Sequence, residues 1–220
     1  MISSTMPLFL ASSSPRRAQL LADMGFEFQT LSADVCSVDE TPQENESALV
    51  LVERLARSKA ALALSMADLP DDSVVLAGDT VVIHQGRIFG KPVDKQDATA
   101  MLSALSGQTH AVVTAIAVAH AADCRSVTVR TDVTMMPLSE EQIAAYVSTG
   151  EPFDKAGAYA LQGLAAQFVE RISGSWGAVV GLPQYETAQL LAAFGIRPFW
   201  QKRNNEIQSM STLSMKRNSP

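Results

Sequence analysis

The sequence predicts an α/β fold with a mixed sheet, because strand-like and helical segments alternate along its 220 residues, with hairpins among them. Apolar residues make up 47% of the chain and charged residues 18%, which is enough apolar material for a sizeable core. At this length we expect one domain, or two small lobes built around one continuous sheet.

The first half of the chain begins with a short apolar run, Leu8 to Ala11, that predicts a strand. Ser14 suits a helix cap and Pro15 the first helical position, so a helix is expected from Pro15 to about Met24, closed by Gly25. Periodicity and turn residues then predict strands over 26–31, 73–77, 81–83 and 88–89, a polar loop over 36–45, a turn over 84–87, and helices over 46–66 and 94–105.

The second half predicts a hairpin of two strands over 109–119 and 126–135. Further elements are a helix from Ser139 to about Ser148, a strand over 167–172, and a last helix that Pro183 starts and Gly195 ends. The glycine-containing stretches 157–163 and 174–177 are typical of turns. We expect one domain over 1–196 and a basic, disordered tail over 197–220.

The charge is unevenly divided. The net charge is −6 for the whole chain, which separates into −10 for residues 1–196 and +4 for residues 197–220. An acidic body disfavours nucleic acid as a partner, so an anionic ligand would need a local cluster of donors and the help of a cation. The longest charge-free run, 98–122, is too polar for a bilayer, so no membrane association is expected. Cys36 and Cys124 form no metal or disulfide pattern, which fits a reducing cytoplasm.

The segment Ser12-Ser13-Ser14-Pro15-Arg16-Arg17 is the first candidate site. A strand that ends in hydroxyls and opens a helix presents backbone N–H groups to an anion, and the two arginines add fork-shaped donors suited to phosphate. An ordinary capped helix with solvated arginines explains the same spacing equally well.

The second candidate is Gly78-Asp79-Thr80, which we place at the carboxyl end of the strand over 73–77, where open α/β sheets bind ligands. Asp79 can ligate a divalent cation or take a proton from water. A turn-forming aspartate is the commoner explanation of such a tripeptide.

Four further residues carry little information alone. Lys91 lies between a glycine and a proline, Lys59 lies on a basic helical face, Glu40 is a loop acid, and Gln162 lies among glycines. Solvated charges and simple turn chemistry account for each of them. The chain also has no GxxxxGK[ST] and no GxSxG, and its three histidines lack metal or triad spacing.

Taken together, these pieces resemble the Maf family of nucleoside triphosphate pyrophosphatases. The matching blocks are LASSSPRRAQLL, VDETP, LVERLARSKA, VLAGDTVV, GKPVDKQDATAMLSALSGQTHAVVTA, EPFDKAGAYALQG and VVGLP, in the family's order from about Leu8 to Ile196. Each block alone is weak evidence for the family, whereas the whole set in this order is specific to it.

The resemblance implies an elongated mixed sheet flanked by helices, with a deep cleft between two lobes, similar to the inosine-triphosphatase fold. It implies hydrolysis of a nucleoside triphosphate to the monophosphate and pyrophosphate with Mg²⁺ or Mn²⁺, in a protein that is often a homodimer. The catalytic residues would be Asp79, Lys59 and Lys91. Asp79 and Glu40 would hold the metal, and Ser14, Arg16 and Arg17 would form the anion-binding element.

Within that family, Thr80 and Gln162 match relatives that act on dTTP and UTP, and with Arg16 they occupy the positions expected to set specificity. A hydroxyl and an amide can pair with the edge of uracil or thymine. One alternative is a pyrophosphatase that acts on a modified pyrimidine triphosphate or on 7-methyl-GTP, and relatives that act on 7-methyl-GTP tend to carry Gln at the position of Thr80. The other is a non-catalytic, nucleotide-binding regulator of septum formation.

Overall fold

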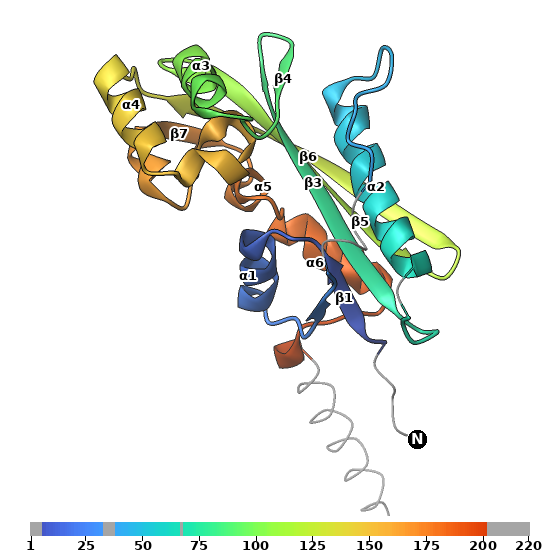
Figure 1. The fold of residues 1–220 in the computed structure, drawn as a ribbon. Helices are drawn as coiled ribbons and strands as arrows, with labels where there is room; N and C mark the ends of the chain where they lie inside the picture. The colour runs from blue at the N-terminus through green and yellow to red at the C-terminus, as the bar shows by residue number, and fades with distance from the viewer. Residues whose placement is uncertain (1–5, 33–37, 67, 202–220) are drawn as a thin grey trace, which may run out of the picture.

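A computed structural model describes residues 6–32, 38–66 and 68–201 of the chain. In this part of the chain, seven strands form one mixed sheet in the order β2-β1-β3-β5-β6-β7, with β4 paired to β3 (Figure 1). The strands are β1 (Leu8–Ala11), β2 (Gln29–Thr30), β3 (Val74–His84), β4 (Arg87–Phe89), β5 (Thr109–His120), β6 (Asp123–Met135) and β7 (Val169–Ser173). β1 runs parallel to β2 and β3, and the other pairings are antiparallel, which confirms the predicted mixed α/β sheet.

The helices begin where the sequence supplies caps. The Ser14 side chain accepts from the Arg17 N–H, and Asp94 accepts from the Asp97 N–H. Ser139 forms a reciprocal capping box with Gln142. The α-helices are α1 (Pro15–Asp23), α2 (Ala48–Met66), α3 (Lys95–Leu105), α4 (Glu140–Ser148), α5 (Trp176–Val180) and α6 (Gln184–Ala193), and the 3-10 helices are η2 (Glu151–Asp154), η3 (Ala156–Ala158) and η4 (Leu164–Phe168).

One face of the sheet is covered by α2. Because side chains alternate along a strand, the odd-numbered residues of β3 face this helix. Val75, Ala77 and Val81 are buried there against α2 residues that include Val52, Ala56 and Ala60. Asp79 belongs to the same alternation and therefore faces α2 as well.

The opposite face carries two separate apolar clusters. At one end, Leu76 and Ile116 pack with residues of α1 and α6. At the other end, Val82 and Val112 pack with α3, α4 and the 3-10 segments. Between the clusters the same face carries Gly78, Thr80 and Thr114 in place of large apolar residues. This interruption divides the molecule into two lobes that share β3 and β5, as Figure 1 shows.

Three expectations about the elements were wrong. The strand expected over 26–31 is reduced to β2, because Phe26 is buried in the core beside α1 instead of pairing with a strand. The two strands expected over 73–77 and 81–83 are one strand, because the ladder with β5 continues from Val75–Ala119 to Ile83–Ala111. The stretches expected to be simple turns contain η3 and the start of α5, which Ser175 caps at the Ala178 N–H.

Of the tail expected over 197–220, the structure describes residues 197–201. The Phe199 N–H donates to the Gly25 carbonyl at 2.9 Å, and the Trp200 indole N–H donates to the Met24 carbonyl at 3.3 Å. The rest of that prediction lies outside the described residues. Among the residues that are described, no helix is both long enough and apolar enough to cross a membrane.

Candidate active site

A cleft of about 810 Å³ opens between the two lobes, beside the middle of β3. The pairing of β1 with β3 ends at Ala77, and the pairing of β4 with β3 begins at Val82. Among the described strands, residues 78–81 therefore have a partner on one edge only, which is β5. The cleft occupies the gap that β1 and β4 leave on the other edge. Its volume is typical of a site for a small molecule.

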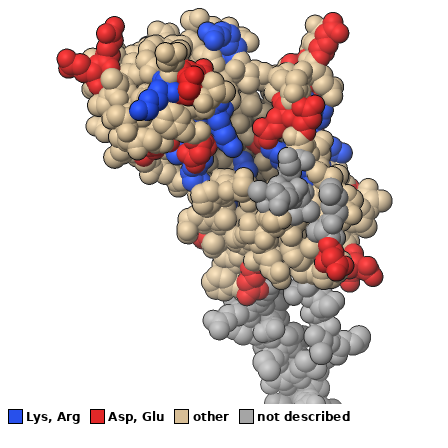
Figure 2. Space-filling model, in the orientation of Figure 1, with Lys and Arg blue, Asp and Glu red and all other residues tan. Residues whose placement is uncertain are grey.

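All nine residues that the sequence singles out line this cleft. Three come from the N-cap and first turn of α1, two from β3, and one each from α2, the loop before α2, the loop after β4 and the loop before η4. They are Ser14, Arg16, Arg17, Glu40, Lys59, Asp79, Thr80, Lys91 and Gln162. Figure 2 shows Lys, Arg, Asp and Glu side chains gathered around the hollow at the centre of that face.

At the α2 side of the cleft, Lys59 lies between two carboxylates. Its Nζ is 2.7 Å from Asp79 Oδ1 and 2.6 Å from Glu40 Oε1. The side chains of Lys59 and Asp79 are 13% and 14% exposed, whereas that of Glu40 is 64% exposed. Burial lowers the pKa of Lys59, but the charges and hydrogen bonds of Asp79 and Glu40 outweigh burial and raise its pKa. The lysine is therefore held as an ammonium.

The carboxylates around this lysine offer oxygen ligands that suit a divalent cation. Two carboxylates from separate segments, Asp79 and Glu40, converge on one point, which the Lys59 ammonium occupies. Within the described ranges, no group of three or more His, Cys, Asp or Glu side chains could hold a metal ion. A pair of carboxylates fits Mg²⁺, which is often held by one or two carboxylates together with water and substrate phosphates.

The two adjacent arginines of α1 differ in environment. Arg17 is buried, and it donates from Nε to the Gly181 carbonyl at 2.8 Å and from Nη1 to Ser12 Oγ at 2.7 Å. Burial lowers its pKa, while the charge of Asp79 opposes that shift. Arg17 therefore ties α1 to the end of α5 and fixes the geometry of the Ser12–Ser14 turn.

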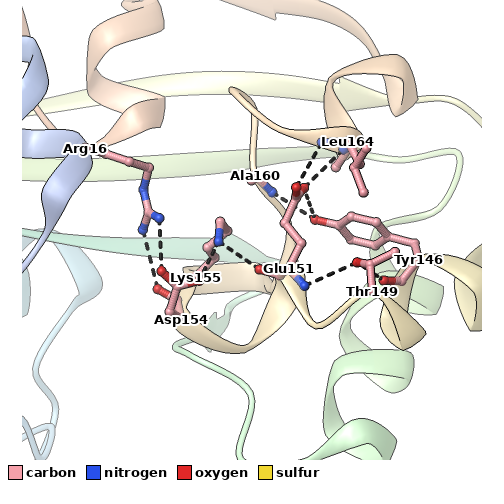
Figure 3. Close-up of polar contacts among 9 residues, drawn as sticks. Arg16, Tyr146, Thr149, Glu151, Asp154, Lys155, Ala160 and Leu164 are labelled. Carbon is pink, nitrogen blue, oxygen red and sulfur yellow. Dashed lines mark hydrogen bonds and ion pairs between the residues drawn. The ribbon is translucent and has the colours of Figure 1, made fainter.

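Arg16 reaches across the cleft to the other lobe. Its Nη1 is 3.1 Å from Asp154 Oδ2, and Asp154 also pairs with Lys155 (Figure 3). Burial raises the pKa of Asp154, but hydrogen bonds from Lys155 and Arg16 outweigh it and lower the pKa. The Arg16–Asp154 pair is the contact that joins α1 to η2 over the cleft.

Thr80 lies on the face of β3 opposite Asp79. Its hydroxyl is 2.9 Å from the hydroxyl of Thr114, directly across the ladder on β5. Thr114 is fully buried and donates to the Ala178 carbonyl of α5 at 2.7 Å. Beyond Thr80 on this face, Val82, Val112, Tyr159 and Val179 form an apolar part of the cleft lining. The Arg17 guanidinium lies at the other side of Thr80, where a Cβ at Gly181 would meet both Arg17 Nη2 and Thr80 Oγ1.

The loop that carries Gln162 is held by a clasp, defined here as Tyr146 and Glu151. The Tyr146 hydroxyl donates to Glu151 Oε1 at 2.9 Å and accepts from the Ala160 N–H at 3.2 Å. The Glu151 carboxylate also accepts from the Leu164 and Ala165 N–H groups. Both ends of the loop over 160–165 are thus fixed, as Figure 3 shows.

The structure corrects one expectation about the site and adds residues to it. Asp79 lies inside β3 and not at a strand end, because the ladder with β5 does not break there. Sequence reasoning did not single out Thr114, the clasp or Asp154. For Thr114 there was a signal, since it is the one polar residue in the apolar run over 111–119.

An α/β protein whose cleft combines arginines, lysines and a pair of convergent carboxylates is built to bind a small anionic ligand. The chain belongs to the Maf family, because the family described as "Maf-like protein" matches residues 7–194. It is 50% identical over 192 residues to the "dTTP/UTP pyrophosphatase" of Escherichia coli O157:H7, covering 85% of this chain and 92% of the relative. It is 48% identical over 190 residues to the protein of the same name from Hahella chejuensis, covering 86% and 93%.

Among solved structures, the chain is similar to the Staphylococcus aureus Ham1 protein. The TM-score is 0.42 at 14% sequence identity, and the similarity covers 86% of this chain and 97% of that chain.

Proposed function

We propose that this protein is a nucleoside triphosphate pyrophosphatase that hydrolyses dTTP and UTP to the monophosphate and pyrophosphate in the cytoplasm. The observation that carries the proposal is the Lys59–Asp79–Glu40 cluster, which faces the Ser14–Arg17 turn across one cleft. The names of relatives at 48% and 50% identity over most of both chains support the substrate class.

The phosphates lie, in this proposal, between the start of α1 and the lysines. Ser14 and the first turn of α1 offer hydroxyl and backbone donors at the positive end of a helix. Arg16, Lys59 and Lys91 supply positive charge for the pyrophosphate that departs. Arg17 acts mainly by fixing the turn, because its Nε and Nη1 are engaged by Gly181 and Ser12.

Asp79 and Glu40 would hold the divalent cation, Mg²⁺ or Mn²⁺. When bound, such a cation neutralises phosphate charge and lowers the pKa of water. The Asp79 carboxylate orients the attacking water and, as a general base, takes its proton. The water oxygen bonds to the α-phosphorus, the bond from that phosphorus to the oxygen bridging to the β-phosphorus breaks, and pyrophosphate leaves with the bridging oxygen. Lys59 keeps the two carboxylates aligned until substrate arrives.

The base lies, in this proposal, on the Thr80 side of β3, against the apolar lining that includes Val82 and Val112. The hydroxyl of Thr80 and the amide of Gln162 are polar groups that can pair with the edge of a base there. A homodimer stays a prediction, which the molar mass in solution would test.

The test is pyrophosphate release from dTTP, UTP, CTP, GTP and 7-methyl-GTP, each with Mg²⁺ or Mn²⁺. We expect dTTP and UTP to be preferred, and Asp79→Asn to lose about 10²- to 10⁴-fold in kcat. Asp71→Asn, the same change at an exposed position outside the cleft, is the matched control. A preference for 7-methyl-GTP would overturn the substrate assignment, and nucleotide binding without turnover would point to a regulator.

A further inference from the structure

We propose that Thr114 is a positioning residue for substrate specificity, because it turns the Thr80 hydroxyl into a hydrogen-bond acceptor toward the base. An acceptor at this place selects a pyrimidine with a proton on N3, as in uracil and thymine, and disfavours cytosine. The inference rests on the proposed function and concerns how the same cleft distinguishes UTP from CTP.

The direction of the hydrogen bonds follows from counting protons. A hydroxyl donates one hydrogen bond, and a carbonyl oxygen only accepts. The Thr114 hydroxyl lies 2.7 Å from the Ala178 carbonyl, so its proton is used in that bond. The 2.9 Å contact between the two threonine hydroxyls must then be donated by Thr80. The Thr80 proton therefore points away from the cleft, and a lone pair of its oxygen remains for a ligand.

The surroundings of Thr114 fix this arrangement. Thr114 is 0% exposed and is paired with Thr80 in the ladder of β3 and β5, so the two side chains are direct neighbours on one face of the sheet. The acceptor Ala178 belongs to α5, whose start is tied to β6. There, Thr131 Oγ1 accepts from the Ser175 N–H at 3.0 Å and donates to the Ser175 carbonyl at 3.3 Å.

The lining of the cleft places a base near Thr80 and not near Asp79. Alternation along β3 puts the Asp79 carboxylate on the face with Lys59, whereas Thr80 lies among Val82, Val112 and Tyr159. A flat base packs better against the side chains of Val82, Val112 and Tyr159 than beside the Lys59–Asp79 ion pair. In uracil and thymine, N3 carries a proton and can donate to Thr80. In cytosine, N3 is itself an acceptor, so two lone pairs would face each other.

The experiment compares kcat/KM for UTP and CTP in the full chain and in a cycle of variants. Thr114→Val keeps the shape of the side chain and removes its hydroxyl, which leaves the Thr80 proton free to turn into the cleft. We expect the UTP:CTP ratio of kcat/KM to fall about tenfold or more in this variant. Thr114→Ser, which keeps the hydroxyl, should retain the ratio of the wild-type protein.

The cycle distinguishes a specific effect from general damage. If Thr114 acts through Thr80, then Thr114→Val has no further effect on the ratio in a Thr80→Val background. The inference would be overturned if Thr114→Val left the UTP:CTP ratio of kcat/KM unchanged. It would also be overturned if Thr114→Val lowered that ratio as much in the Thr80→Val background as in the wild-type protein. If the wild-type protein hydrolyses neither dTTP nor UTP, the proposed function is overturned, and the inference with it.

A substrate test on the wild-type protein keeps the inference testable if Thr114→Val does not fold. UTP should be hydrolysed faster than CTP, because the cytosine ring has the same shape as uracil but carries no proton on N3. UTP should also be hydrolysed faster than N3-methyl-UTP, in which a methyl group replaces the N3 proton. Equal rates for the three nucleotides would contradict an acceptor at Thr80.

Discussion

The ammonium of Lys59 lies 2.7 Å from the Asp79 carboxylate and 2.6 Å from that of Glu40, so one side chain of α2 keeps two acids from separate segments facing each other. Without the lysine, these like charges would repel at short range. The pair that would hold a cation is thus assembled before any ligand binds.

The first prediction concerns this lysine. Lys59→Met removes the ammonium while keeping the length of the side chain, and we expect kcat/KM for dTTP to fall about 10²-fold or more. The free energy of unfolding should fall by about 1–3 kcal/mol, because a poorly exposed carboxylate loses its charged partner. Lys95→Met, at the exposed start of α3, is the control in the same assays. Near-normal turnover in Lys59→Met would remove the lysine from the mechanism.

The second prediction concerns the Arg16–Asp154 pair over the cleft. These side chains are 27% and 60% exposed, so breaking the pair should change stability by less than about 1 kcal/mol. Asp154→Asn should instead lower the KM for dTTP, because the Arg16 guanidinium then has no ion pair to break before it binds phosphate. Asp132→Asn breaks the comparable Arg130–Asp132 pair on β6 and should leave the KM unchanged. A KM that rises in Asp154→Asn would show that the pair itself builds the site.

The third prediction concerns the Tyr146–Glu151 clasp. A Cβ at Gly163 would clash with the Glu151 carboxylate, so Gly163→Ala should displace it from the Leu164 and Ala165 N–H groups. We expect a loss of about 1–3 kcal/mol in unfolding free energy, similar to that in Glu151→Gln, since each leaves backbone donors poorly paired.

Urea denaturation of both variants and of the double variant measures this loss. The double variant should lose much less than the sum of the single losses, because both changes break the same bonds. Gly90→Ala is the control for stability, because a Cβ there meets nothing within 4 Å. Additive losses would show that Gly163 acts independently of the clasp.

The fourth prediction is a pH dependence of stability from His110. This side chain is buried, its Nε2 lies 2.8 Å from the Tyr159 hydroxyl, and its Nδ1 has no hydrogen-bond partner among the described residues. Burial, with a smaller contribution from the neighbouring His84, lowers its pKa to about 4, while Asp132 opposes the shift. The folded protein therefore resists protonation of His110 at pH values where the unfolded chain, with a pKa near 6.5, accepts the proton.

The resulting stability is fully present above pH 6.5 and is lost as the pH falls toward 4. The loss should reach about 3 kcal/mol at the lower limit. Unfolding free energies from pH 7.5 to pH 4 should show this loss in the wild-type protein and a smaller one in His110→Gln, which does not titrate. Parallel curves for the two proteins would contradict the assignment.

Much of the fold could be predicted because local rules decide it. The caps at Ser14, Asp94 and Ser139 start helices where side-chain acceptors meet free N–H groups, and the hairpin of β5 and β6 follows from its apolar pattern. The break expected at Gly78 was wrong because tertiary pairing with β5 overrides the turn preference of glycine and aspartate.

The candidate residues of the cleft were found through a pattern shared with a family, and the structure brings all nine into one cleft. The residues that support them were not found. Thr114 acts through a ladder register, and Glu151 acts on backbone groups 13 and 14 residues away, so both depend on contacts that no local spacing reveals.

The most direct test of the account is hydrolysis of dTTP with Mg²⁺ in water enriched in oxygen-18, followed by mass spectrometry of the products. The account predicts dTMP that carries the label and unlabelled pyrophosphate, with both products lost in Asp79→Asn and retained in Asp71→Asn. Label in the pyrophosphate, or release of inorganic phosphate in its place, would contradict attack at the α-phosphorus.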